Sequence, residues 1–297
     1  MFKLLKVIFG IIIFIIILAI AFVVTLVIIN WSNKPKKKEQ SNAHKLSDLT
    51  TLTVNVDVKD AYVVVKKSKT EYVNLTYYSC KTRTFDINEE VDGLGNETLT
   101  VKGYQTGKWY NRIFFTFNTT KVYGVTIEVP DGLNVYVKAK TDNGNIRFEE
   151  AYAGAFIADV NNGAVIMTKA AKASICNFKT VNGNVEVNGC TAGTFTSETK
   201  KGRVILNNLT ALATIDASTD NGKILLTDTY ATGNITLHSG KGDIKGTISL
   251  LSDAYYKIKT KAVNGNSNLN NTTEGIADLN VTTDNGNIDI TLRKILG

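Results

Sequence analysis

Proline, histidine and cysteine are all scarce in this chain. It has 297 residues but only two Pro, two His and three Cys. With so little proline, few strands are interrupted, because proline cannot donate to a sheet ladder. Cys80, Cys176 and Cys190 are too few for a disulfide framework, and their spacing does not match that of metal ligands. The histidine count argues against a His-based metal site or a catalytic triad, so we expect no metal and no cofactor.

A surplus of charge is also missing from most of the chain. The formal net charge is +7, but residues 1–45 contain seven Lys and one Glu, a net of +6. Residues 46–297 therefore carry 27 basic and 26 acidic residues, a net of +1. Nucleic-acid binding needs a concentrated basic surface, so we expect no nucleic-acid partner.

One long apolar run stands near the N-terminus. Val7 to Ile29 is a stretch of 23 residues without a charge. It would extend about 35 Å as a helix, enough for a hydrocarbon core of about 30 Å. A cleaved signal peptide is the alternative, with Ala19-Ile20-Ala21 as its small-residue site. Because the sequence stays apolar beyond that site, we predict a single-pass anchor in the lipid bilayer over residues 7–30, after a short flank at 1–6.

Lysines on both sides of the run leave its orientation nearly balanced. Lys3 and Lys6 precede it, and Lys34 and the Lys36–Lys38 cluster follow it. Positive flanks normally stay in the cytoplasm, and this count alone slightly favours a cytoplasmic C-terminal part. Residues 31–48 are polar and Lys-rich, which predicts a flexible stalk between the anchor and a folded domain.

The second half of the chain is periodic. Eight windows such as Thr-Asp-Asn-Gly-Asn-Ile align on one glycine, with steps of 19, 20, 19, 20, 20, 23 and 21 residues. The aligned glycines, which we expect at the repeat turns, are Gly144, Gly163, Gly183, Gly202, Gly222, Gly242, Gly265 and Gly286. A constant step of this size indicates a solenoid, propeller or array.

Alternating apolar residues on both sides of each glycine predict two short strands per repeat. Ile146 and Phe148 follow the first glycine, and Phe156 and Ala158 precede the second. A propeller blade needs about 40–45 residues, and a hairpin array fits the step less well, so the pattern favours stacked turns. We predict an all-β protein, with a parallel β-helix (β-solenoid) of about eight rungs of about 20 residues over 140–297 and an N-terminal β cap over 49–139.

Like residues recur within the repeats. Thr or Ser stands three before most of the glycines, as at Thr141 and Ser239, and Asn stands one before, as at Asn143 and Asn162. Stacked in register, such residues form ladders, and Asn ladders add side-chain hydrogen bonds. The repeat at Gly265 is weaker and follows a longer step, so we expect a loop or bulge there.

These features together resemble the bacterial putative-adhesin family, a set of β-strand-repeat domains of unknown function. The resemblance rests on the Lys-rich stalk, on Ile127-Glu128-Val129-Pro130 before the repeats and on the Thr-x-Asn-Gly-x-Ile/Val windows, and it covers about residues 50–297. It implies a cell-envelope protein with one N-terminal membrane segment and the domain outside the cell. It transfers no catalytic residue, because its motif is structural.

Candidate ligand contacts are confined to one aromatic stretch. Tyr104, Trp109 and Tyr110 stand among Gly, Gln, Lys and Asn, as in an exposed loop, and exposed aromatics are frequent in binding sites. The alternative is that they cover the end of the solenoid. Cys176 and Cys190 occupy positions that are apolar in other repeats, which predicts buried core residues.

We therefore predict a non-enzymatic, membrane-anchored envelope protein that binds an unknown envelope polymer or protein, with its C-terminal domain outside the cytoplasm. An accessory component of an envelope-stress signalling system, acting through membrane partners, is the alternative. An envelope-polysaccharide enzyme is the weakest hypothesis, because the repeats carry no cluster of acidic and basic residues on one face.

Overall fold

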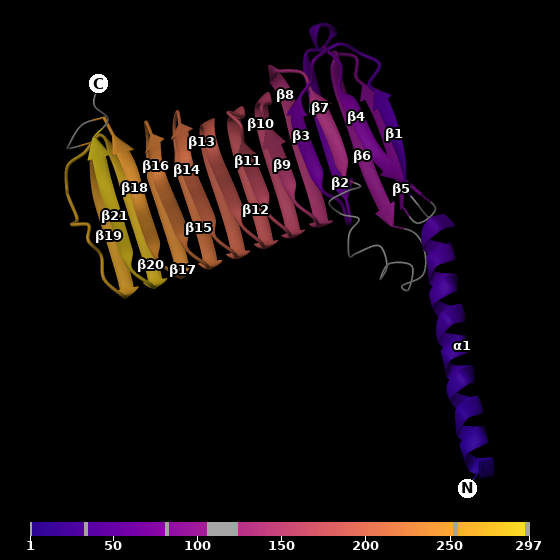
Figure 1. Cartoon of the computed structure of the whole chain (residues 1–297). Coiled ribbons are helices and arrows are strands. Elements are labelled where there is room, and N and C mark those ends of the chain that lie inside the picture. Colours follow the sequence, from indigo (N-terminus) through magenta and orange to yellow (C-terminus); the bar gives the residue numbers. More distant parts are fainter. Residues whose placement is uncertain (1, 33–34, 81–82, 106–123, 252–254, 295–297) are drawn as a thin grey trace.

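A computed structural model describes residues 2–32, 35–80, 83–105, 124–251 and 255–294. One long helix, α1 (Phe2–Ser32), lies at one end of a long stack of β-strands (Figure 1). The predicted all-β class is thus confirmed, and so is a helix at the N-terminus. The strands form an open sheet, mostly parallel, in a solenoid-like arrangement.

The predicted single-pass location at a cell membrane, anchored through residues 7–30, has to be corrected. A span takes about 20 consecutive, predominantly apolar residues. The side chains described within α1 are those of residues 9–25. No helix in the described part of the chain combines the length and the apolar character that crossing a membrane requires.

Two rows of parallel strands build the stack, because each repeat contributes one strand to each row. The first row, in spatial order, is β2 (Thr51–Val58), β8 (Gly132–Asn143), β10 (Tyr152–Asn162), β12 (Lys172–Asn182), the end of β13 (Val185–Lys201), β15 (Ile215–Asn221), β17 (Ile235–Lys241), β20 (Ala277–Asn285) and β19 (Tyr256–Asn264). The second is β3 (Val63–Lys67), β9 (Ile146–Glu149), β11 (Val165–Thr168), the start of β13, β14 (Val204–Ala211), β16 (Ile224–Ala231), β18 (Ile244–Leu250) and β21 (Ile288–Lys294).

The N-terminal end is closed by strands that precede the repeats. β6 (Asn96–Gln105) lies beside β2, and β7 (Val125–Val129) lies beside β3. Three antiparallel strands finish this end, namely β1 (Lys36–Ser41), β4 (Asn74–Ser79) and β5 (Arg83–Val91). Part of the predicted cap therefore belongs to the parallel stack itself.

The segment predicted to be a flexible stalk, residues 31–48, contains regular structure. β1 pairs with β4, and a 3₁₀ turn, η1 (Leu46–Asp48), follows it. All six residues of β1 are exposed, so backbone pairing with an available sheet edge, and not apolar burial, accounts for this strand.

The C-terminal repeats are stacked out of sequence order. β17 pairs with β20 and not with β19, and β19 pairs with the outer side of β20. The residues between β19 and β20 form no strand, as the weak repeat at Gly265 predicted. Their only ladder contact there is an isolated bridge from Ser267 to Ile288.

The core runs between the two rows along the whole stack. It is lined by the alternating apolar residues, and Phe148, Phe156, Phe178 and Phe195 are fully buried. The ring of Phe178 stacks on Phe148 at 5.4 Å and meets Phe195 edge-on at 5.7 Å. Cys176 and Cys190 are buried as predicted, and burial raises the pKa of the Cys190 thiol to about 11.

The glycines and hydroxyls of successive repeats contact one another. A Cβ added to Gly183 would lie 1.9 Å from the carbonyl oxygen of Gly163, so only glycine fits at this approach. That same carbonyl accepts a 2.9 Å hydrogen bond from the buried hydroxyl of Thr180. The Asn ladder is real but interrupted: Asn182 donates to Asn162 and Asn162 to Asn143, each at 2.9 Å, before Lys201 takes the next position.

Candidate functional site

Two places in the fold gather chemically useful side chains. The first is a cavity of about 700 Å³ along one corner of the stack. It is lined by residues of successive turns, among them Tyr152, Lys169, Lys172, Thr191, Gly193 and Leu212. We call it the corner groove.

Small residues line much of the groove. Residues of three neighbouring turns are in register here, with Tyr152 beside Lys172 and Lys172 beside Thr191. The next residue of each turn is Ala153, Ala173 or Ala192, and all three alanines are buried. Of these, Ala173 and Ala192 line the groove. Since neighbouring strands lie about 4.8 Å apart, the row from Tyr152 to Thr191 spans about 10 Å.

Most charges in the groove are paired. Lys169 forms ion pairs with Glu149 at 2.7 Å and Glu150 at 3.7 Å. Its hydrogen bond with Glu149 raises the pKa of Lys169. Asp131 pairs with Lys67. Lys172 is exposed, and within the described residues it has no ion-pair partner, so the one uncompensated charge of the groove is positive.

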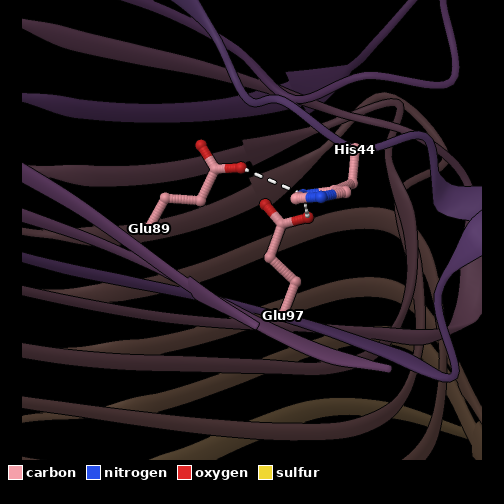
Figure 2. Close-up of side chains that lie close together, drawn as sticks. All are labelled: His44, Glu89 and Glu97. Carbon is pink, nitrogen blue, oxygen red and sulfur yellow. Dashed lines mark hydrogen bonds and ion pairs between the residues drawn. The ribbon is translucent and has the colours of Figure 1, made fainter. Parts of the chain in front are cut away.

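The second place is a cluster of His44, Glu89 and Glu97 near the N-terminal end of the stack. Figure 2 shows both carboxylates directed at the ring of His44. The Nδ1 atom of His44 lies 3.2 Å from Oε1 of Glu89 and 3.6 Å from Oε2 of Glu97. The Glu97 side chain is fully buried, while that of His44 is 46% exposed.

The pairing of β5 and β6 explains how the two glutamates meet. Val91 lies opposite Glu97, and Glu89 lies opposite Leu99, so the glutamates are diagonal neighbours on one face of this hairpin. That face is the inner one, because Leu99 and Val101 on β6 are buried. Both carboxylates thus stand at positions that elsewhere on the hairpin hold core residues.

Asn42 holds the buried carboxylate in place. Its side-chain nitrogen donates to Oε1 of Glu97 at 2.8 Å, and its side-chain oxygen accepts from the backbone N–H of Val73 at 2.8 Å. Oε2 of Glu97 has no hydrogen-bond partner among the described atoms. Burial raises the pKa of Glu97, and the Asn42 hydrogen bond lowers it by a smaller amount.

Tyr104, the described member of the aromatic residues predicted to contact a ligand, does not join either place. Tyr104 lies on β6 and is 44% exposed, but it lines neither the corner groove nor the His44 cluster. Trp109 and Tyr110 lie outside the described residues. A role for these three residues therefore stays a prediction.

A family model matches residues 51–291, from the start of β2 into β21. Its description is Toastrack DUF4097. The chain belongs to the Toastrack DUF4097 family. This is a domain of unknown function, and the membership confirms the family resemblance predicted from the repeat windows.

Solved structures similar to this Toastrack protein carry names that suggest adhesion or lipid binding. A putative adhesin from Bacteroides fragilis is 16% identical, with a TM-score of 0.47 over 86% of this chain and 97% of that one. A putative cell adhesion protein from Clostridium sporogenes is 13% identical, with a TM-score of 0.29 over 87% and 100%. A putative lipid-binding protein from Parabacteroides distasonis is 13% identical, with a TM-score of 0.27 over 89% and 97%. No curated protein matches the chain.

Sequence reasoning missed both candidate places in this Toastrack chain. His44 was assigned to the stalk, so its approach to Glu89 and Glu97 depends on where residues 42–44 fold back. One signal was available in the sequence. Glu97 continues the alternation of Leu99 and Val101, which places its carboxylate on the buried face of a strand. The groove could have been suspected from the alanines that follow each turn.

Proposed function

We propose that this protein is a non-enzymatic binding module that holds an acidic polysaccharide in the corner groove. In this proposal the stack is a parallel β-helix of about eight rungs that serves as a rigid frame for the groove. The observation that carries the proposal is the groove itself, with Lys172 as its uncompensated charge.

The lining of the groove supports a carbohydrate better than an apolar ligand. The ring of Tyr152, 36% exposed, can stack on a sugar ring, and the hydroxyls of Ser174 and Thr191 can bond to sugar hydroxyls. The ammonium group of Lys172, which has no ion-pair partner in the described part of the chain, favours a carboxylate-bearing polymer. The groove follows the direction in which turns are stacked, so a linear polymer can contact the same corner of several turns.

The test is binding of the purified full chain to alginate, an acidic polysaccharide, with neutral dextran as the comparison. We expect binding to alginate that weakens as salt is raised, because exposed charges are screened. Tyr152→Ala and Lys172→Ala should each weaken binding by about tenfold, which corresponds to about 1.4 kcal/mol.

Two control variants separate the groove from the rest of the surface. Lys200→Ala removes an exposed lysine that does not line the groove. Tyr104→Ala removes an exposed tyrosine that also lies outside the groove and that the sequence predicts as a ligand contact. Both should bind alginate within about twofold of the unmodified chain. Equal binding to dextran, or a Lys172→Ala variant that binds alginate unchanged, would contradict the proposal.

A further inference from the structure

Two of the three ligand separations in the His44 cluster are close to those around one small cation, and the three candidate ligand atoms all lie within 4.8 Å of one another. Two ligands at about 2.0–2.1 Å from a tetrahedral zinc ion lie about 3.3–3.4 Å from each other. The Nδ1 atom of His44 is 3.2 Å from a Glu89 oxygen and 3.6 Å from a Glu97 oxygen. A small adjustment of exposed His44 and of Glu89 would bring all three atoms to one ion.

Hydrogen bonding within the cluster leaves one atom unsatisfied. A neutral imidazole with its proton on Nδ1 donates to only one oxygen, and Glu89 is at hydrogen-bond distance. The contact from Nδ1 to Oε2 of Glu97 is too long for a hydrogen bond, and this fully buried oxygen has no other partner among the residues that the structure describes. A buried carboxylate oxygen without a partner is costly, and a bound cation would remove that cost.

The surroundings of the cluster are also those of a metal site. Asn42 bonds to Oε1 of Glu97 and so orients its Oε2 toward His44, and the backbone N–H of Ala43 donates at 2.9 Å to Oε1 of Glu89, the same oxygen that faces His44. Two carboxylates and a neutral imidazole sum to a charge of −2, which a divalent ion balances. The exposed side of His44 leaves an entry path and room for a water ligand.

We propose that His44, Glu89 and Glu97 bind one divalent transition-metal ion, with zinc as the best fit. Zinc accepts this mixture of imidazole nitrogen and carboxylate oxygen with three protein ligands, whereas magnesium and calcium take oxygen ligands. Bound there, the ion fastens residues 42–44 to the hairpin of β5 and β6. It thus joins the segment that follows α1 to the end of the stack.

The test is zinc binding by the purified full chain after chelator treatment, measured by calorimetry, together with thermal unfolding. We expect one zinc per chain and a rise in melting temperature, because an ion that binds only the folded state stabilises it. His44→Gln should weaken zinc binding by about 100-fold or more, since even the loss of an outer-shell partner costs about 10–100-fold.

The second histidine provides the matched control. His238 contacts Thr282 at 2.9 Å on another part of the stack, so His238→Gln should bind zinc like the unmodified chain. Glu89→Gln offers a second ligand variant at a partly exposed position, in case a change at buried Glu97 disturbs folding. The proposal is overturned if the unmodified chain binds no zinc, if His44→Gln binds it equally well, or if calcium or magnesium binds more tightly than zinc.

Discussion

Each corner glycine lies against a backbone carbonyl of the neighbouring turn. The contacts run from Gly144 to Gly163, Gly183, Gly202, Gly222, Gly242, Gly286 and finally Gly265. The sequence predicts these glycines at the repeat turns. The structure gives another reason, because five of these eight have no φ in the left-handed region and all lack space for a Cβ. Buried hydroxyls such as that of Thr219 then satisfy the same carbonyls.

This packing predicts that Gly202→Ala is strongly destabilising. The new Cβ would lie 1.8 Å from the carbonyl oxygen of Gly183, so the two turns would have to separate. We expect a loss of about 1–3 kcal/mol or more in the free energy of unfolding, measured by urea denaturation. Gly93→Ala is the control, because a Cβ there meets nothing within 4 Å, and it should change stability by no more than about 0.5 kcal/mol. Equal midpoints for the two variants would show that the turns are not in close contact.

At the scale of elements, both ends of the stack depart from sequence order. Near the N-terminus, β6 and β7 are outside β2 and β3, although they follow them in the chain. Near the C-terminus, β20 is inserted between β17 and β19. Asp243 helps to fasten this junction, because it accepts a hydrogen bond from the backbone of Asn287 at 3.1 Å and pairs with Lys223 at 2.9 Å.

The inserted strand predicts an unusual order of hydrogen exchange. β20 has a neighbour on each side, whereas β19 pairs with β20 alone among the described strands. Although β20 is nearer the C-terminus, we expect its amides to exchange more slowly than those of β19, because an edge strand opens more readily. Peptides covering 256–264 and 277–285 in a mass-spectrometric exchange experiment compare the two. Faster exchange in 277–285 would mean that the repeats stack in chain order.

At the scale of the whole molecule, one continuous core connects the ends. Buried apolar residues run from Leu49 to Ile290 in a single cluster. The two candidate places lie apart on this frame, with the corner groove beside the middle turns and the His44 cluster near the N-terminal end. A rigid stack keeps such places at fixed positions, because each turn contacts its neighbours directly.

This continuity makes the centre of the core the most sensitive position. Phe178→Ala removes a fully buried ring that contacts two other phenylalanines, and we expect a loss of about 3–5 kcal/mol. Ile175→Ala, on the same strand but 49% exposed, should cost less than about 1 kcal/mol. Urea denaturation monitored by circular dichroism compares the two. A small effect of Phe178→Ala would mean that the turns are stable independently of the shared core.

Local pattern determined most of the stack. A glycine every 19 to 23 residues, flanked by alternating apolar residues, specifies strand, corner and strand, because side chains of a strand alternate between its faces. The burial of Cys176 and Cys190 followed from the same alignment. The repeat pattern could not determine which turns are neighbours at the ends. The windows around Gly265 and Gly286 are so similar that either could pair with the same strand.

Tertiary structure alone decided the two candidate places and the strand order. The corner groove exists because lining residues of successive turns meet in register, and the His44 cluster exists because residues 42–44 fold back onto the hairpin of β5 and β6. Such contacts join residues up to 55 positions apart, as from Asn42 to Glu97, and no local periodicity encodes them. The sequence determined the repeating strands by itself because their pattern reflects a neighbour one turn away, which is the same at every repeat.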